Sequence, residues 1–329
     1  MTEQIYDLTI IGGGPVGIYG AFYAGMHGMN AKIIDSLPEL GGQLAALYPE
    51  KYIYDLPGHP KIKAGEMIEQ LITQMNQFKE KIDVVTNTNV QTVEKLEDGT
   101  FKICTNHECH YSRSVIITAG NGAFTPRPLD VANAEQVKNI HYFVSSMDSF
   151  KGKEVVIFGG GDSAVDWALM LEGVAKSVKL VHRRDEFRAH ASSVEKLHAS
   201  SVEVLTPYVA KSLANEGEKV TSIELTNLNT NESVQIATDE IIVLFGFISS
   251  LGPIKEWDLE LDKNALCVNH RQQTSVSGMF AAGDACTFDG KIKMITTGFG
   301  EVVTAINAAI QYAYPEKVHR HKHSSALVK

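Results

Sequence analysis

The sequence predicts an α/β fold made of two Rossmann-like, three-layer nucleotide-binding domains. Three observations predict it: two glycine-rich turns that each join a β-rich run to a helical pattern, and a strand-like run near residue 280 that resumes the first module. A chain of 329 residues has room for about two domains of roughly 150 residues. We therefore expect one domain from residues 1–117 and 249–329, and a second domain, residues 118–248, inserted into it.

The composition is that of a globular protein with an acidic balance. Hydrophobic residues make up 44% and charged residues 21%, which excludes a disordered chain. The net charge of −9 argues against a nucleic-acid binder that relies on a positive field. No apolar run approaches the roughly 18–20 residues that span a bilayer, and we expect no signal peptide, since the first residues have no basic segment or small-residue cleavage site. We expect a cytoplasmic protein that binds neither nucleic acid nor a membrane.

The first glycine-rich turn follows the β-rich run 5–11. It reads G-x-G-x-x-G at Gly12, Gly14 and Gly17, and the next strand ends at Asp35, 23 positions after Gly12. In a βαβ unit the first glycine makes the tight turn, the second lets the backbone approach a pyrophosphate, and the third packs the helix on the sheet. An acidic residue at the end of the second strand can accept hydrogen bonds from a ribose diol. This segment predicts a dinucleotide site.

The second turn repeats this design with one informative change. Gly159, Gly161 and Ala164 form a G-x-G-x-x-A variant, and His182 stands 23 positions after Gly159. Three arginines follow: Arg183, Arg184 and Arg188. Guanidinium groups can hold a 2′-phosphate that an acid would repel, which favours NADP(H) over NAD(H). The alternative is a solvated basic turn. Two such modules in one chain suggest FAD in the first and NADPH in the second.

Other segments fill in the two domains. Apolar runs at 114–120 and 240–246 are predicted strands near the domain junctions, and residues 64–81 a helix. Residues 202–237 have the pattern of strands joined by polar turns.

The returning segment has chemistry of its own. A strand over 277–282 ends at Gly283-Asp284, and a helix that contains Thr297 in its first turn extends to about Tyr312. The Asp284 carboxylate can bind ribityl hydroxyls, and the positive end of the helix favours negative charge on a reduced flavin.

With these motifs in order, the sequence resembles the low-molecular-weight thioredoxin reductases. The matching segments are 41–44, 159–164, 182–184 and 281–284. That family has a redox-active C-x-x-C before the second glycine motif, but residues 141–147 contain no cysteine. The four cysteines stand singly elsewhere, at Cys104, Cys109, Cys267 and Cys286, and we expect no disulfide framework. Thioredoxin reduction is therefore not expected.

The sequence is more similar to the thioredoxin-reductase-like ferredoxin–NADP⁺ reductases, the bacterial type 2 group that lacks the dithiol. The further matches are residues 40–44, 46–52, 118–124, 166–172 and 323–325. The resemblance implies a homodimeric FAD enzyme that exchanges hydride with NADP(H) and single electrons with ferredoxin or flavodoxin. The flavin performs this chemistry, so no catalytic side chain is expected, and no Cys/His set has the spacing of a metal site.

The same resemblance implies a set of FAD contacts. Asp35 holds the FAD ribose, Gln43 contacts the flavin portion, and the Val90 backbone meets the adenine side. Tyr48 stacks on one flavin face with Phe124 nearby, and Asp284 holds the ribityl chain.

The C-terminal tail supplies the remaining FAD contacts that the resemblance implies. His323 covers the other flavin face and Ser325 lies beside the ring, on the partner subunit of the homodimer. If both faces are covered, the tail or the NADPH domain must move before the nicotinamide enters. On residue type alone, Tyr48 is also compatible with core packing and His323 with a frayed tail.

Two other functions remain open from the sequence. One is an NAD(P)H oxidase or another flavin-dependent reductase of a small acceptor, and the other is an FAD-binding redox sensor. An acidic carrier would need local basic patches on this acidic chain, and the candidate residues are Lys61, Lys63, Arg127, Lys151, Lys153, Lys291 and Lys293.

Overall fold

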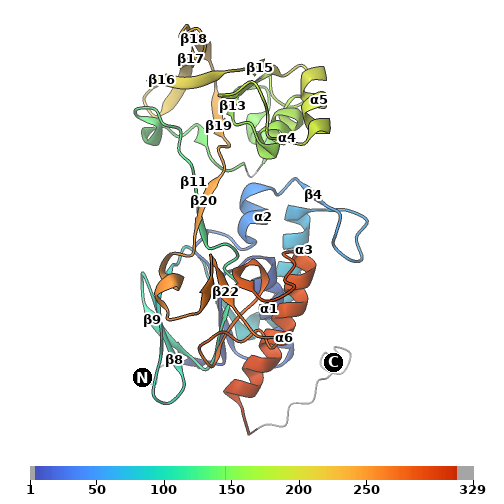
Figure 1. Ribbon diagram of the computed structural model, residues 1–329, viewed down its shortest axis with the longest axis vertical. Coiled ribbons are helices and arrows are strands. Elements are labelled where there is room, and N and C mark those ends of the chain that lie inside the picture. The colour runs from blue at the N-terminus through green and yellow to red at the C-terminus, as the bar shows by residue number, and fades with distance from the viewer. Residues whose placement is uncertain (1–3, 145, 317–329) are drawn as a thin grey trace. The chain divides into compact units, whose positions relative to one another are not determined.

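The chain divides into two compact units (Figure 1). Our computed structural model describes residues 4–144 and 146–316, and for residues 123–125 only the backbone. Unit 1 comprises Met1–Phe124 and Ser249–Lys329, and unit 2 comprises Thr125–Ile248. The expected divisions followed residues 117 and 248. By contact the first division follows Phe124, because the chain after residue 117 stays on unit 1: the Thr118 N–H donates to Ile11 O at 2.8 Å.

The centre of unit 1 is a five-stranded parallel sheet in the order β23-β10-β2-β3-β6. Its strands are β2 (Leu8–Ile11), β3 (Ala31–Ile34), β6 (Ile82–Val85), β10 (Val115–Ile117) and β23 (Met279–Ala281). Side chains alternate between the two faces, so Ile10 and Ile11 enter different core clusters. Four of the strands, all but β6, are buried along their whole length, as expected for a parallel sheet covered on both faces.

Helices cover one face of this sheet. They are α1 (Pro15–Met26), α3 (Ala64–Met75) and α6 (Ile295–Ala313), and a short α2 (Gly42–Leu47) precedes α3. The expected helix 64–81 is correct only to Met75, because a 3₁₀ segment, Asn76–Lys81, follows it with Phe78 in a non-helical conformation. The Phe78 ring packs against Gly25 of α1, and this tertiary contact explains the interruption.

The other face of the sheet is covered by a second sheet and by irregular chain. The second sheet has the order β1-β9-β8-β7, and its strands are β1 (Ile5–Tyr6), β7 (Val90–Lys95), β8 (Phe101–Thr105) and β9 (Cys109–Ser112). A 3₁₀ turn, Gly252–Glu256, packs there too. Two small sheets complete unit 1: β4 (Tyr52–Ile53) with β5 (Ile62–Lys63), and β21 (Leu261–Asp262), β22 (Ala265–Cys267) and β24 (Cys286–Thr287).

The expectation that all four cysteines stand singly is wrong. Cys104 and Cys109 form a disulfide on the hairpin of β8 and β9. The antiparallel register pairs these two residues directly, with Cα atoms 4.0 Å apart, which their separation along the chain does not reveal. Cys267 and Cys286 are free thiols.

Unit 2 has its own five-stranded parallel sheet, in the order β12-β19-β13-β14-β15. Its strands are β12 (Ile140–His141), β13 (Glu154–Phe158), β14 (Ser177–Val181), β15 (Glu203–Leu205) and β19 (Glu240–Val243). Helices α4 (Asp162–Leu171) and α5 (Ala191–Ala199) pack on one face. An antiparallel sheet of β16 (Tyr208–Glu216), β17 (Lys219–Asn227) and β18 (Ser233–Ala237) contributes to the other.

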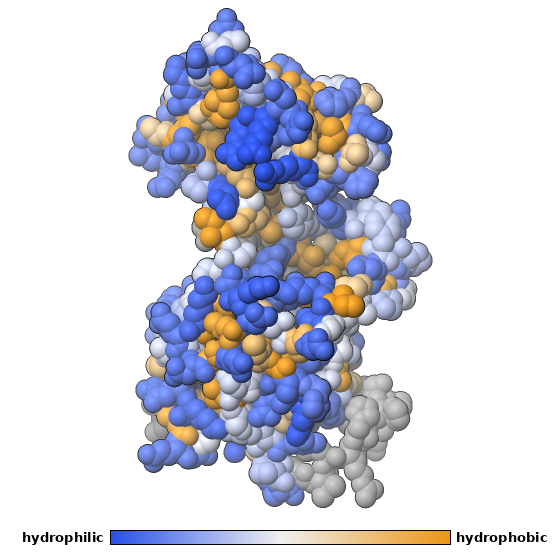
Figure 2. Space-filling view, in the orientation of Figure 1, coloured by the Kyte–Doolittle hydropathy of each residue, from blue (hydrophilic) through white to orange (hydrophobic). Residues whose placement is uncertain are grey.

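The chain passes between the units in two strands, β11 (Ala123–Pro126) and β20 (Phe247–Ser250), which pair with each other. The predicted fold class is confirmed: both units are α/β with a central parallel sheet, and unit 2 interrupts unit 1 in sequence. Polar side chains cover much of the visible surface of each unit (Figure 2). Within the described ranges, no helix has the length and apolarity needed to cross a membrane.

Candidate functional site

The first glycine turn joins β2 to α1. Gly12 has φ +110°, and a Cβ on it would lie 2.6 Å from the Thr118 carbonyl carbon; a Cβ on Gly17 would lie 2.0 Å from Gly12 O. These two positions therefore need glycine for internal packing. Around Gly14, by contrast, a Cβ would meet no atom within 4 Å. Gly14 thus leaves the backbone open, as a phosphate-binding turn requires.

Helix α1 begins directly after this turn. Gly14 is its N-cap and Pro15 its first residue, as the sequence predicted. Its first turn lies at the wall of a cavity, where Gly14, Pro15 and Val16 are lining residues. The positive end of the helix dipole and its unpaired N–H groups favour an anion there.

Asp35 lies at the end of β3 and is 7% exposed. Its Oδ2 accepts from the Gly13 N–H at 2.5 Å and its Oδ1 from the Leu37 N–H at 2.7 Å. Burial raises the pKa of the Asp35 carboxyl above its usual value, while the two N–H groups act in the opposite direction. Each oxygen keeps a lone pair that can accept from a hydroxyl of a ligand.

One cavity of about 430 Å³ in unit 1 brings most of the predicted FAD residues together. Of the predicted set, its lining includes Gly12, Gly14, Asp35, Gln43, Val90 and Asp284. Gly17 is not a lining residue and packs α1 on the turn. The cavity therefore extends from the acidic end of β3 to the turn after β23.

Asp284 belongs to a short 3₁₀ turn, Gly283–Ala285, that follows β23. Gly283 has φ +74°, and a Cβ on it would lie 3.2 Å from Val16 Cγ2, so glycine suits both the conformation and the space. The Asp284 carboxylate accepts no hydrogen bond from any residue that the structure describes. It lines the cavity and is open to a ligand.

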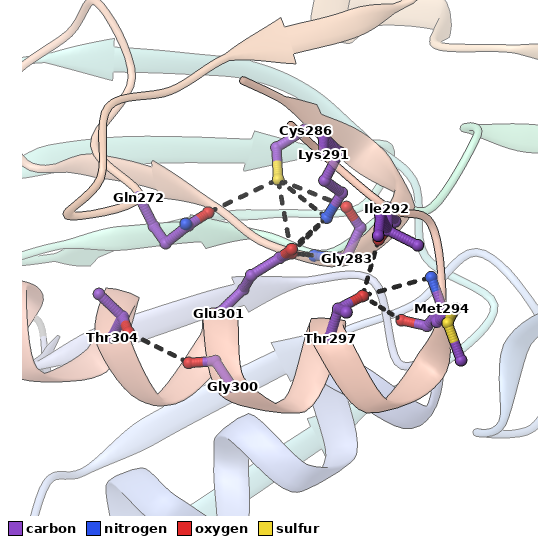
Figure 3. Close-up of polar contacts among 10 residues, drawn as sticks. All are labelled: Gln272, Gly283, Cys286, Lys291, Ile292, Met294, Thr297, Gly300, Glu301 and Thr304. Carbon is purple, nitrogen blue, oxygen red and sulfur yellow. Dashed lines mark hydrogen bonds and ion pairs between the residues drawn. The ribbon is translucent and has the colours of Figure 1, made fainter. Parts of the chain in front are cut away.

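The start of α6 also reaches the cavity wall. Its N-cap Met294 and first residue Ile295 are lining residues, so the positive end of a 19-residue helix meets the cavity. Thr297, a predicted FAD contact, lies in the first turn of α6 and does not line the cavity. Its Oγ1 accepts from the Met294 N–H at 3.3 Å, which caps the helix, and lies 2.8 Å from the carbonyl oxygens of both Ile292 and Met294 (Figure 3).

Tyr48 lines a second, smaller cavity of about 340 Å³. Its ring has the Lys51 ammonium 5.7 Å from its centroid. The two cavities share Leu44, Asp55 and Ile295, so Tyr48 lies next to the main cavity but does not line it. The Phe124 side chain, His323 and Ser325 lie outside the described residues.

The second glycine turn joins β13 to α4 in unit 2. Gly159 has φ +155°, and a Cβ on it would lie 2.7 Å from both Ala164 Cβ and Leu244 O. At Gly161, the N-cap of α4, a Cβ would stand in open space, as it would at Gly14 in unit 1. In both turns, therefore, the first glycine is needed for internal packing and the second leaves the backbone open to a ligand.

His182 follows β14 and turns its ring onto this second motif. A Cβ on Gly160 would lie 2.2 Å from the ring, and the ring stacks on Phe187 with centroids 5.4 Å apart. Burial lowers the pKa of His182, and its Nε2 is buried without a hydrogen-bond partner among the described residues. Arg183, Arg184 and Arg188 are exposed beside it. A neutral ring beside three cations suits a nucleotide with an extra phosphate.

Comparisons with known proteins agree with this geometry. Residues 6–309 match the family described as pyridine nucleotide-disulphide oxidoreductase. The chain is 53% identical over 326 residues to ferredoxin–NADP reductase 2 of Listeria monocytogenes, with 98% of each chain covered. It is also 53% identical over 326 residues to ferredoxin–NADP reductase 2 of Bacillus subtilis, covering 98% of this chain and 97% of the relative. The chain belongs to the ferredoxin–NADP reductase family.

Within this family the fold is that of thioredoxin reductase. The crystal structure of T. acidophilum thioredoxin reductase superimposes with a TM-score of 0.72 at 25% identity, covering 96% of this chain and 100% of the other. The Cys104–Cys109 disulfide does not replace the missing C-x-x-C, because neither cysteine lines either cavity of unit 1.

The main cavity fits the FAD that ferredoxin–NADP reductases of this fold use. The open backbone turn at Gly14 matches a pyrophosphate, and the buried carboxylate of Asp35 matches a ribose. The Asp284 carboxylate, which accepts no hydrogen bond from a described residue, matches the ribityl part of the dinucleotide. Apolar side chains in the lining, such as Leu44, Ile254 and Ile295, suit a ring system.

Sequence reasoning missed one wall of this cavity. It consists of Leu251, Gly252, Pro253, Ile254 and Trp257. The Trp257 indole N–H donates to Gln91 O at 3.0 Å, which ties this segment to β7. Gly252-Pro253 indicates only a turn in the sequence, and a contact 166 positions away gives no local signal.

Proposed function

We propose that this chain is a ferredoxin–NADP⁺ oxidoreductase that binds FAD in unit 1 and NADP(H) in unit 2. The FAD domain then comprises residues 1–124 and 249–329, and the NADPH domain residues 125–248. The observation that supports this most is the cavity of unit 1, which joins an open glycine turn to two carboxylates, Asp35 and Asp284. The full-length relatives are named ferredoxin–NADP reductase, and this name supports ferredoxin as the electron carrier.

In unit 1 we assign the ribose to Asp35, whose carboxylate is already held by two N–H groups. The open turn at Gly14 and the start of α1 receive the pyrophosphate. Asp284 accepts from ribityl hydroxyls, and Gln43 and the start of α6 lie at the flavin. The Val90 backbone meets the adenine side, and Tyr48 stacks on one flavin face with Phe124 nearby.

In unit 2 the start of α4 and the open turn at Gly161 receive the pyrophosphate of NADP(H). Arg183, Arg184 and Arg188 bind the 2′-phosphate, which NADH lacks. The His182 ring packs against Gly160 and supports the glycine turn. Its lowered pKa keeps the ring neutral.

Bound FAD supplies the conversion of a two-electron hydride from NADPH into single electrons for a carrier. The side chains of this chain bind and orient both nucleotides, and none is needed as a proton donor or nucleophile. Flavodoxin is proposed as a second carrier. A cytoplasmic homodimer, with His323 and Ser325 from the partner subunit at the flavin, completes the proposal.

A steady-state assay tests the function. Purified protein should be yellow, prefer NADPH to NADH, and reduce cytochrome c rapidly only when ferredoxin or flavodoxin is added. Turnover of thioredoxin would contradict the proposal. Equal rates with oxygen and with carrier would favour an oxidase, and an absence of carrier-dependent turnover would favour a redox sensor.

A further inference from the structure

The segment between Gly283 and the start of α6 contacts the main cavity at both ends. Gly283 and Asp284 line it at one end, and Lys293, Met294 and Ile295 at the other. The conformation of this connection therefore sets where the Asp284 carboxylate and the positive end of α6 lie.

Glu301, in the second turn of α6, reaches back to this connection (Figure 3). Its Oε2 accepts from the Gly283 N–H at 2.8 Å, and both of its carboxylate oxygens pair with Lys291 Nζ. The two side chains are almost fully enclosed, with 5% of Lys291 and 8% of Glu301 exposed. Lys291 was expected in a surface patch for a carrier, and that expectation is wrong because its ammonium lies inside this cluster.

The surroundings leave these two charges to balance each other. Cys286 Sγ lies 3.4 Å from Gly283 O and 3.8 Å from Lys291 Nζ. Burial raises the pKa of the Cys286 thiol to about 12, so it is uncharged at neutral pH. Gln272, whose Oε1 lies 3.6 Å from the same sulfur, is neutral as well.

A buried ion pair is a poor means of stabilising a fold, because the desolvation of both groups offsets most of their attraction. Removal of one partner, however, leaves an uncompensated charge in a medium of low polarity. Here that charge would lie directly behind the turn that presents Asp284 to the cavity.

We infer that Lys291 and Glu301 are positioning residues for the flavin: Glu301 anchors the Gly283 N–H so that Asp284 faces the cavity, and Lys291 cancels the Glu301 charge behind the cofactor. This inference rests on the proposed FAD site. It assigns to the pair two separable roles, an anchor and a charge balance.

Single substitutions test the charge balance. Glu301→Gln keeps an amide oxygen for Gly283 but leaves Lys291 positive, and Lys291→Met leaves Glu301 negative. The midpoint potential of the bound flavin should shift to more positive values in Glu301→Gln and to more negative values in Lys291→Met, since a nearby cation favours the reduced, anionic flavin. Shifts of the same sign, or none, would overturn this role, because loss of packing alone has no reason to change sign.

Two neutral double variants test the anchor. Lys291→Met/Glu301→Gln keeps the acceptor for Gly283, and Lys291→Met/Glu301→Leu removes it. Release of FAD from the diluted holoenzyme, followed by flavin fluorescence, should be at least tenfold faster in the second. Rates within twofold of each other would overturn the anchor. Because both variants are neutral, they test the anchor even if a single variant fails to fold.

Lys32→Met is the matched control. The Lys32 side chain is 9% exposed, lies 3.6 Å from Glu108 in the same unit and does not line the cavity. The Lys32→Met variant should release FAD at a rate within twofold of the wild-type rate, and the midpoint potential of its bound flavin should not shift. A colourless wild-type protein would refute the FAD site itself, whereas a yellow wild type with unaltered variants would refute only the roles of Lys291 and Glu301.

Discussion

Asp35 and Asp284 line the same cavity, but their carboxylates are held in different ways. Asp35 is fixed before any ligand arrives, because two backbone N–H groups bind its oxygens. Asp284 has no such bonds among the described residues and depends on the turn that bears it. The Asp35 end of the cavity is thus prearranged by local structure, and the Asp284 end by a more distant contact from α6.

Substitution of the arginines in unit 2 should change nucleotide choice. We expect Arg183→Gln/Arg184→Gln to raise the KM for NADPH about tenfold to a hundredfold, since a charge-assisted hydrogen bond contributes about 1.5–3 kcal/mol. The KM for NADH should stay within about twofold, because NADH lacks the 2′-phosphate. Steady-state kinetics with both nucleotides measures this. Lys211→Gln, at an exposed pair with Glu224 in the same unit, is the control. A parallel loss with both nucleotides would contradict the assignment.

The pH dependence of stability should depend on His110. Burial lowers the pKa of His110 from 6.5 to about 4, its Nε2 lies 3.1 Å from Thr9 Oγ1, and its Nδ1 is buried without a partner among the described residues. Between these two pH values the unfolded chain binds a proton that the folded chain does not. The contribution of His110 to stability is therefore present above pH 6.5 and is lost as the pH falls toward 4.

His110→Gln should reduce this loss, because glutamine can bond to Thr9 but does not titrate. The difference in Tm between pH 7 and pH 5 should be smaller in the variant than in the wild type. His107→Gln, at an exposed neighbouring position, should behave as the wild type does. An equal decrease of Tm in His110→Gln and wild type would show that His110 does not cause it.

At the scale of elements, the two glycine turns allow a paired test. Gly14 and Gly161 both have extended backbone and free space around a Cβ, so alanine strains neither fold. Gly14→Ala should lower FAD retention at least tenfold with the KM for NADPH unchanged, since the methyl group enters the space of the FAD pyrophosphate.

Gly161→Ala should raise the KM for NADPH at least tenfold and leave the protein yellow. Flavin content and steady-state kinetics distinguish the two. Gly17→Ala is the contrasting variant, because its Cβ would lie 2.0 Å from Gly12 O and should prevent stable folding. If Gly14→Ala and Gly161→Ala lose both nucleotides equally, the turns do not have separate roles.

The hairpin of β8 and β9 permits a second test at this scale. Its disulfide closes a loop of cysteines five positions apart, and a loop this short contributes about 2 kcal/mol to the free energy of unfolding. Cys104→Ser/Cys109→Ser should lose about that much in urea unfolding under oxidising conditions. FAD content should be unchanged, because neither cysteine lines the main cavity or the one beside it. Loss of flavin in this variant would show that the hairpin affects the site.

Elements with local signals were predictable from the sequence. Pro15 after glycine marks the start of α1, and the apolar runs at 5–11 and 114–120 predict strands, which the structure has at Leu8–Ile11 and Val115–Ile117. Contacts between distant segments were not. Phe78 interrupts a helix because of Gly25, and the cysteine pair depends on hairpin register. The Lys291–Glu301 ion pair depends on how the chain turns between β24 and α6, which the sequence does not show.

At the scale of the whole molecule, each unit has a separate core. The core clusters of unit 2 draw only on residues between 129 and 244, and those of unit 1 on residues outside that range. Residues 125–248 expressed alone should therefore fold cooperatively and bind NADP⁺ but no FAD. Urea unfolding and calorimetric titration measure this, with Arg183→Gln/Arg184→Gln as the control for binding. A fragment without a cooperative transition would show that unit 2 needs the rest of the chain.

The discontinuity of unit 1 has a consequence for biosynthesis. A ribosome delivers residues 1–124 first, but that stretch lacks β23, Asp284 and α6, which arrive after the whole of unit 2. Unit 2 can complete its core while unit 1 still lacks the edge strand β23 and the covering helix α6. With NADP(H) in unit 2 and FAD in unit 1, as proposed, the nascent protein should acquire its NADP(H) site first, and unit 1 can enclose the flavin only once α6 has left the exit tunnel.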